Sequence, residues 1–396
     1  MRWWVGVAGL LLVSCVEERI APAPVPEPPT PEFRHQAFYE TLRADAEHFG
    51  QREGDWLEDY GDAPFYGLAF YAHTTPEDAR TVAARARAVS LITDIDFSTA
   101  DLQEVTMSAL GLMEYADATG DDADVAVLDA FVDEMDGLAK AIGYYVPTEG
   151  VESWALRTYG PTAISALIGL VNAEHAVRIG SRRDERIAFA REVAKHVAEV
   201  AYDGTRFAFA SDNPMLCLYP NVSMILLDSR LFQLTGEVSY RERALRTYDA
   251  IQALRLSDLP TRYYSPYSAA AMGATTTDYS TLSSHNYLML ALAVLYEVTR
   301  DPRFVEELDS VLDALETQLY GSWCLSHVHE ESCPTTCSET EVCVVDACTE
   351  DSCQGGVLHH WIDGRPAAPT DPEYFCSGCN LQALYVMWYR SVRLME

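Results

Sequence analysis

The sequence predicts an all-α domain in which six helical hairpins close into a ring. Three observations support this fold class: a helix-start pattern recurs roughly every sixty residues, an aromatic residue recurs half a repeat away, and six copies can be counted. A single hairpin cannot bury its apolar face alone, so such repeats pack side by side. The period is too long for tetratricopeptide repeats, and six copies favour a closed ring over an open solenoid.

The second helix of each pair is predicted from its start. Five segments place Ser, Thr or Asp where the side chain can accept hydrogen bonds from unpaired backbone N–H groups, with proline or an acid in the first turn. These caps are Thr75, Asp121, Ser181, Ser239 and Asp301, spaced 46, 60, 58 and 62 residues apart. Phrases such as SRLFQLTGE and LYEVTRDPR predict the tight joint before the cap. This set is charged and amphipathic, so we expect it outside the ring, near 33–52, 76–91, 123–142, 184–201, 240–254 and 302–319.

The first helix of each pair follows an aromatic marker. The six markers are Tyr60, Phe97, Tyr159, Tyr219, Tyr279 and Phe375. The helices that follow are more apolar, so we expect them inside, near 64–73, 100–118, 160–179, 219–235, 280–298 and 378–394. The phrase DPEYFCSGCNLQALYVMW is then the sixth copy, delayed by a cysteine-rich insertion.

From Phe33 onward this repeat, with phrases such as LTGEVSYRERAL and VTRDPRFVEEL, resembles the six-hairpin (α/α)6 toroid superfamily of glycosidase-like proteins. That superfamily includes many glycoside hydrolases, some polysaccharide lyases and some sugar epimerases. The resemblance implies one toroid domain over 33–396, with long loops forming a bowl at the N-terminal ends of the inner helices. It implies action on a carbohydrate but rests on no catalytic signature, so hydrolase, lyase and epimerase chemistry all stay open.

The predicted bowl loops are rich in aromatic side chains and acids. Aromatic faces stack on the apolar faces of sugar rings, although Tyr is also often half-buried in a core. The ring-stacking candidates are Trp56, Trp154, Tyr159 and Tyr263.

Two polar clusters supply the acid/base candidates. TTTDYSTLSSHNY (275–287) stands at the mouth of an inner helix, and LHHWIDGRP (358–366) predicts a β-hairpin with Asp-Gly at its turn. Histidine and carboxylate together suit proton transfer, and glycoside hydrolysis needs two carboxylates. The catalytic candidates are Asp278, His285, His360 and Asp363. Hydrogen-bonded structural clusters are the alternative interpretation of both segments.

Eight cysteines crowd the C-terminal part of the chain and are candidates for disulfides: Cys324, Cys333, Cys337, Cys343, Cys348, Cys353, Cys376 and Cys379. The first six fall in a predicted insertion, 321–356, which has little with which to build a core and is typical of a small disulfide-stapled module. A Cys324–Cys353 bridge would close its neck. Zn²⁺ binding is an alternative, but the spacing fits no standard finger.

The Cys376–Cys379 pair leaves three interpretations. These are a structural disulfide (within the pair or to Cys217), a metal pair completed by Cys217 or His360, and a redox dithiol. We prefer the disulfide, and we predict no cofactor and no metal site. Neither Ca²⁺ nor Zn²⁺ has specific support.

The N-terminal residues predict export and lipid attachment. A short apolar run after Arg2 leads to Leu12-Val13-Ser14-Cys15, which resembles the lipobox of bacterial lipoproteins. The resemblance implies a signal peptide over 1–14, a lipid on Cys15 that anchors the chain to a bilayer, and a proline-rich tether to residue 32. The same resemblance implies, from Val16 after the cysteine, that the membrane is the outer one. An ordinary signal peptide with a chance cysteine is the alternative.

Charge and missing motifs exclude several function classes. The formal net charge is -32 and no basic stripe exists, which excludes nucleic acid as a partner. The chain has no Gly-x-x-x-x-Gly-Lys-Ser/Thr, Gly-x-Gly-x-x-Gly, His-Glu-x-x-His or Gly-x-Ser-x-Gly motif. The sequence therefore predicts a membrane-anchored extracytoplasmic lipoprotein that acts on a carbohydrate. The alternative is a non-catalytic tethered binding or scaffolding lipoprotein.

Overall fold

A computed structural model describes residues 32–46, 63–93, 95, 102–147, 159–258, 260–266, 279–324, 353–357, 360–362, 365–366 and 377–395. The predicted signal peptide and most of the predicted tether and insertion lie outside these residues.

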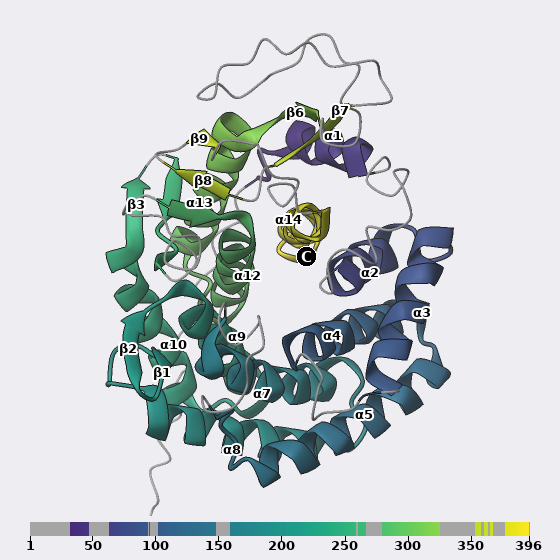
Figure 1. The fold of residues 1–396 in the computed structure, drawn as a ribbon, viewed down its shortest axis with the longest axis vertical. Coiled ribbons are helices and arrows are strands. Elements are labelled where there is room, and N and C mark those ends of the chain that lie inside the picture. The colour runs from purple at the N-terminus through teal and green to yellow at the C-terminus, as the bar shows by residue number, and fades with distance from the viewer. Residues whose placement is uncertain are drawn as a thin grey trace, which may run out of the picture.

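The described residues form two concentric layers of helices (Figure 1). The inner layer consists of α2 (Ala63–Thr74), α4 (Leu102–Thr119), α7 (Gly160–Arg178), α9 (Leu218–Thr235), α12 (Leu282–Thr299) and α14 (Ser377–Trp388), the last continued by the π-helical turn η4 (Tyr389–Arg393). The outer layer consists of α1 (Gln36–Ala46), α3 (Ala79–Thr93), α5 (Asp122–Ala141), α8 (Arg183–Ala201), α10 (Val238–Ile251) and α13 (Pro302–Ala314).

The inner helices close into a ring. Each contacts the next in the order α2, α4, α7, α9, α12 and α14, and α14 returns to contact α2. The first described helix, α1, packs on α14, so the two ends of the domain together make the sixth hairpin. The predicted all-α (α/α)6 toroid is therefore confirmed.

Sequence explains which layer each helix joins. Nearly every residue of α7 is buried, as expected for a helix that is apolar or small on all sides and packed all round. Gly169 lets α7 approach its neighbours closely, because a Cβ at this position would lie 2.8 Å from Cδ2 of Leu227 on α9. By contrast the outer helix α3 buries a single stripe, Thr81, Ala84, Ala88 and Ile92.

Two of the five predicted caps are confirmed and three are wrong in detail. Asp121 and Asp301 accept hydrogen bonds from the first-turn backbone of α5 and α13. Ser181 does not cap α8, because its hydroxyl bonds Asp129 instead. Ser239 lies inside α10, and Asp78 rather than Thr75 accepts from the backbone at the start of α3.

Short antiparallel strands occupy the connections that lead into the inner helices. They are β1 (Ala208–Ala210) with β2 (Asn213–Leu216), β3 (Arg255–Asp258) with β4 (Thr261–Tyr263), β5 (Tyr279–Thr281) with β8 (His360–Ile362) and β9 (Arg365–Pro366), and β6 (Tyr320–Cys324) with β7 (Cys353–Val357). The 3-10 turn η1 (Gln252–Leu254) lies between α10 and β3, and the π-helical turn η2 (Leu315–Leu319) lies between α13 and β6. The predicted hairpin within 358–366 is confirmed by the pairing of β8 with β9.

Among the described helices, none has both the length and the apolar character needed to cross a bilayer.

Candidate functional site

Three tyrosines cluster at the N-terminal ends of neighbouring inner helices. Tyr159 precedes α7, Tyr219 lies in the first turn of α9, and Tyr287 lies in the second turn of α12. Their ring centroids are 4.5 Å (159–219), 5.7 Å (219–287) and 6.3 Å (159–287) apart, all with edge-to-face tilt. The Tyr219 hydroxyl lies 2.6 Å from that of Ser283 on α12. We call these three residues the tyrosine cluster and this end of the barrel the mouth.

A glycine fixes Tyr159 at the mouth. Gly160 has φ of +83°, and a Cβ there would lie 2.7 Å from the Phe209 ring and 2.8 Å from its carbonyl oxygen. Pro161 then starts α7, where its missing N–H would have no helical partner anyway. The chain can turn into α7 next to β1 only because residue 160 has no side chain.

The two polar clusters singled out in the sequence come together at the mouth. β5 and β8 pair antiparallel, with Tyr279 opposite Ile362 and Thr281 opposite His360. Thr281 also caps α12, because its hydroxyl accepts from the Ser284 N–H. The segment that carries His360 is thus joined to the start of the helix that carries His285.

His285 is locked inside this arrangement. It is fully buried, its Nε2 accepts from the Tyr263 N–H at 3.0 Å, and its Nδ1 donates to the Thr281 carbonyl at 2.8 Å. Burial lowers the pKa of His285 to about 4, so the ring is neutral near pH 7. This geometry favours a structural role, which ties β4 and β5 to α12.

Tyr263 does not offer a ring face to a ligand. It is fully buried in β4, and its hydroxyl donates to Glu307 on α13, which also accepts from Tyr248. The predicted stacking role of Tyr263 is therefore wrong in this arrangement, because its ring belongs to the contact between the mouth and the outer layer.

The remaining predicted residues are distributed as follows. Tyr159 lies in the tyrosine cluster, and His360 is placed by its strand. Outside the described residues lie Trp56, Trp154, Asp278, Asp363, Cys15, Cys333, Cys337, Cys343, Cys348 and Cys376. Sequence reasoning missed Tyr219 and Tyr287; Tyr219 was noted only as a repeat marker, although its position at a helix start was the available signal.

The described cysteines narrow the disulfide alternatives. Cys217 is a buried thiol and Cys379 is disulfide-bonded, so these two are not joined to each other. Cys324 and Cys353 are direct partners in the β6–β7 ladder, a register that would suit the proposed neck bridge. Among the described residues, no group of three or more His, Cys, Asp or Glu side chains is placed to hold a metal ion.

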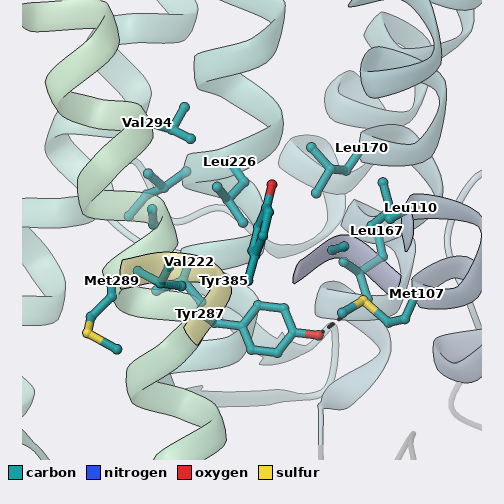
Figure 2. Packing of buried hydrophobic residues seen from close by; sticks show 14 of the residues in the cluster. Met107, Leu110, Leu167, Leu170, Val222, Leu226, Tyr287, Met289, Val294 and Tyr385 are labelled. Carbon is teal, nitrogen blue, oxygen red and sulfur yellow. Dashed lines mark hydrogen bonds between the residues drawn. The ribbon is translucent and has the colours of Figure 1, made fainter. Parts of the chain in front are cut away.

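An apolar layer lies beneath the tyrosine cluster. Figure 2 shows side chains from several inner helices converging there, including Met107, Leu167, Leu226 and Tyr385. The Tyr287 hydroxyl points into this layer and donates to the Met107 sulfur at 3.1 Å. These packed side chains separate the mouth from the opposite end of the barrel.

A closed network of ions fills that opposite end. We call it the ion ring: His73, Glu114, Glu174, Arg178, Arg230, Glu297, Tyr385 and Tyr389. Every inner helix contributes. Arg178 pairs with Glu114 at 2.5 Å and Glu174 at 2.9 Å, while Arg230 pairs with Glu174 at 2.5 Å and Glu297 at 3.0 Å. Arg178 is the last residue of α7, where the helix dipole favours a cation.

Glu114 shows how completely the ion ring is paired. It accepts hydrogen bonds from His73 at 2.8 Å and Tyr385 at 2.5 Å besides its contact with Arg178. Burial alone would raise the pKa of Glu114, but the charge of Arg178 and these hydrogen bonds outweigh it and lower the pKa to about 2. The ion ring therefore has a structural role at this end. At the other end the rings of the tyrosine cluster are also buried, with exposed fractions of 3% for Tyr159, 4% for Tyr219 and 2% for Tyr287.

A recess of about 390 Å³ lies between the outer helices α8 and α10, lined by Lys195, Glu199, Glu237, Tyr240 and Arg243 among others. It belongs to the outer layer and contains none of the predicted site residues.

The fold and its mouth define this chain as an (α/α)6 toroid protein, and solved structures share that fold. An α-mannanase of glycoside hydrolase family 76 from Bacteroides thetaiotaomicron aligns with a TM-score of 0.58 at 11% identity, over 90% of this chain and 95% of that one. A sugar epimerase from a ruminal bacterium gives 0.57 at 13% identity, over 89% and 98%. An unsaturated glucuronyl hydrolase specific for heparin gives 0.56 at 10% identity, over 90% and 95%. No protein-family model and no curated protein sequence matches the chain.

Proposed function

We propose that this chain is an extracytoplasmic lipoprotein whose toroid binds a carbohydrate at the mouth and acts on it. One observation carries the proposal: the β5–β8 pairing brings two separate polar segments together beside the tyrosine cluster. Solved proteins of the same fold include a mannanase, an epimerase and a glucuronyl hydrolase, which supports this substrate class by analogy.

Asp278 and Asp363 are the acid/base pair that we propose. Each is the chain neighbour of one member of the Tyr279–Ile362 pair. Two carboxylates near one another repel, which raises the pKa of one and lets it act as an acid while the other stays ionised. Glycoside hydrolysis requires such a pair on opposite sides of the bond.

The test uses full-length protein purified in detergent and a panel of mannans, glucans and uronate-containing polysaccharides with their oligosaccharides. Reducing ends report hydrolysis, absorbance of unsaturated uronate reports a lyase, and sugar analysis of the products reports an epimerase. On the active substrate, Asp278→Asn and Asp363→Asn should each lower kcat by about a hundredfold or more. Asp212→Asn, in the exposed turn after β1, is the matched control and should retain full activity. Full activity in both variants would exclude the pair.

A non-catalytic binding lipoprotein is the second candidate. It is favoured by the state of His285, whose two ring nitrogens are both bonded to backbone groups. Saturable sugar binding without any product, and without epimerised sugar, would select this alternative.

Anchoring is tested separately. Cys15 is the proposed site of lipid attachment, so labelled palmitate should enter the wild-type protein and should not enter Cys15→Ser. Equal labelling of both would exclude lipidation at this cysteine.

A further inference from the structure

The chain enters the toroid at the end that holds the ion ring. Inner helices begin at the mouth and end at the ion ring, so the outer helices, which run the opposite way, begin at the ion-ring end. The helix α1 follows this rule. Asp45 in its last turn accepts a hydrogen bond at 2.7 Å from Tyr320, the first residue of β6, which lies at the mouth. The first turn of α1 therefore lies toward the ion ring.

The residues before α1 are held at that same end. The carbonyl of Glu32 accepts a hydrogen bond from Arg390 at 3.4 Å, and the Arg390 guanidinium lies 5.7 Å from the centre of the Phe33 ring. Arg390 is the chain neighbour of Tyr389, a member of the ion ring. Arg390 is itself fully buried and pairs with Asp309 at 3.1 Å. The chain therefore leaves the toroid beside the ion ring, and everything upstream of residue 32 is attached there.

Exposed apolar side chains are also concentrated at the ion-ring end. Six large apolar side chains are exposed in the described part of the chain, and five of them lie in first turns of outer helices or at the ends of inner helices. These five are Val82 on α3, Val177 on α7, Val238 on α10, Val392 in η4 and Met395 just after it. Single exposed apolar residues are ordinary in soluble proteins, so none of them binds a bilayer alone. Their shared position nevertheless agrees with the side from which the chain leaves.

We propose that the toroid is held with its ion-ring end toward the bilayer and its mouth facing away from it, an inference that rests on the proposed lipid on Cys15. Residues 16–31 separate that cysteine from the toroid, and at about 3.1 Å per residue an extended proline-rich segment of this length spans at most about 50 Å.

The opposite orientation would require the tether to run back along the barrel. Four inner helices have 18 or 19 residues, which makes the barrel about 28 Å long. Six prolines within 21–31 predict a semi-rigid spacer, which disfavours such a reversal. A substrate therefore reaches the mouth from the side away from the anchoring membrane, so it is not the head group of a lipid in that leaflet.

The test places one fluorescent label at each end of the full-length, lipidated protein in vesicles of phosphatidylcholine and phosphatidylglycerol. Ala123→Cys carries the label at the ion-ring end, in the first turn of α5, and Ser211→Cys carries it at the mouth, in the turn between β1 and β2. Both positions are exposed. Cys217, the free cysteine of the described residues, is buried, and wild type treated with the same maleimide dye measures background labelling.

Energy transfer to a rhodamine-labelled lipid reports how far each label lies from the bilayer. We expect transfer from residue 123 to be more efficient by about twofold or more than transfer from residue 211, because the labels lie about 28 Å apart along the barrel. Adding Cys15→Ser to either labelled protein should abolish the transfer, since the lipid is what brings the protein to the vesicle.

Two results would overturn the orientation while leaving the anchor intact. Equal transfer from the two labels would mean that the toroid turns freely on its tether. More efficient transfer from residue 211 would place the mouth on the bilayer.

A third result would remove the anchor together with this inference. In that case neither labelled protein would float with the vesicles, and Cys15→Ser would make no difference. Failure of the carbohydrate activity alone would change none of these readings, so the two failures are distinguishable.

Discussion

Replacing Glu114 with glutamine tests whether the ion ring holds the toroid closed. The carboxylate has three partners, and its side chain is 7% exposed. Its pKa of about 2, against an ordinary glutamate pKa of 4.5, means that the fold favours the charged form by about 3 kcal/mol. Removing one member of a buried ion pair typically costs about 3–5 kcal/mol. Both routes give the same magnitude, so we expect Glu114→Gln to lose about 3 kcal/mol of unfolding free energy at pH 7.

The pH dependence makes this prediction specific. Because the folded pKa of Glu114 is depressed, its contribution is complete above pH 4.5 and is lost as pH falls towards 2. At pH 3 the difference between wild type and variant should have shrunk to about half of its value at pH 7. The assay is urea unfolding followed by circular dichroism at both pH values.

The control for this variant is Glu242→Gln. Glu242 is on the surface of α10, 57% exposed, with one distant arginine partner at 3.8 Å, and its replacement should change stability by less than about 0.5 kcal/mol. A loss of below about 1 kcal/mol for Glu114→Gln at pH 7 would refute the role of the ion ring, since the lower bound for a broken buried pair is larger. A difference that stayed constant down to pH 3 would refute the charge-based explanation.

Three further outcomes are expected from urea unfolding. Gly169→Ala should lower the free energy of unfolding by about 1–3 kcal/mol, because its methyl would meet a leucine methyl of α9 at 2.8 Å. Gly137→Ala, in open space on α5, should raise that free energy by up to about 1 kcal/mol. Equal effects of the two changes would contradict the packing argument. Arg390→Met should lower the free energy of unfolding by about 3–5 kcal/mol, because it leaves the buried Asp309 of α13 without its charged partner. An unchanged free energy would show that the pair is dispensable. Burial lowers the pKa of His175 and His285 to about 4, so the free energy of unfolding should fall as pH drops from 6.5 to 4. If His175→Asn showed the same dependence of this free energy on pH as wild type, His175 would be excluded as a cause of the loss.

The repeat made the ring of hairpins predictable, because helix periodicity and caps are local signals. Helix bounds agree to within a few residues over most of the chain. The three misplaced caps have different causes. The Ser181 hydroxyl reaches Asp129 on a neighbouring helix, a partner 52 residues away that no local pattern reveals. Thr75 and Ser239 were misplaced because α3 and α10 begin at other residues.

The mouth was only partly predictable for the same reason. Sequence identified both polar clusters, but the β5–β8 pairing that joins them spans about eighty residues and leaves no trace in either segment. His285 was a reasonable acid/base candidate by residue type, yet its role depends on two backbone groups, one of them supplied by a strand 22 residues earlier. The ion ring was missed because Glu114, Glu174 and Glu297 look like ordinary acids near helix ends.

The position of the site follows from how polar groups are satisfied at the two ends of one barrel. A toroid of inner helices leaves unpaired carbonyl groups and negative dipole ends on one side, and unpaired N–H groups and positive dipole ends on the other. On the first side, Arg178 and Arg230 form ion pairs with three glutamates. On the second side the chain places tyrosines and hydroxyls. A chain with net charge -32 would have little difficulty in placing carboxylates beside those N–H groups. The described residues at this end are instead mainly neutral polar and aromatic side chains, and they pack against one another rather than forming ion pairs.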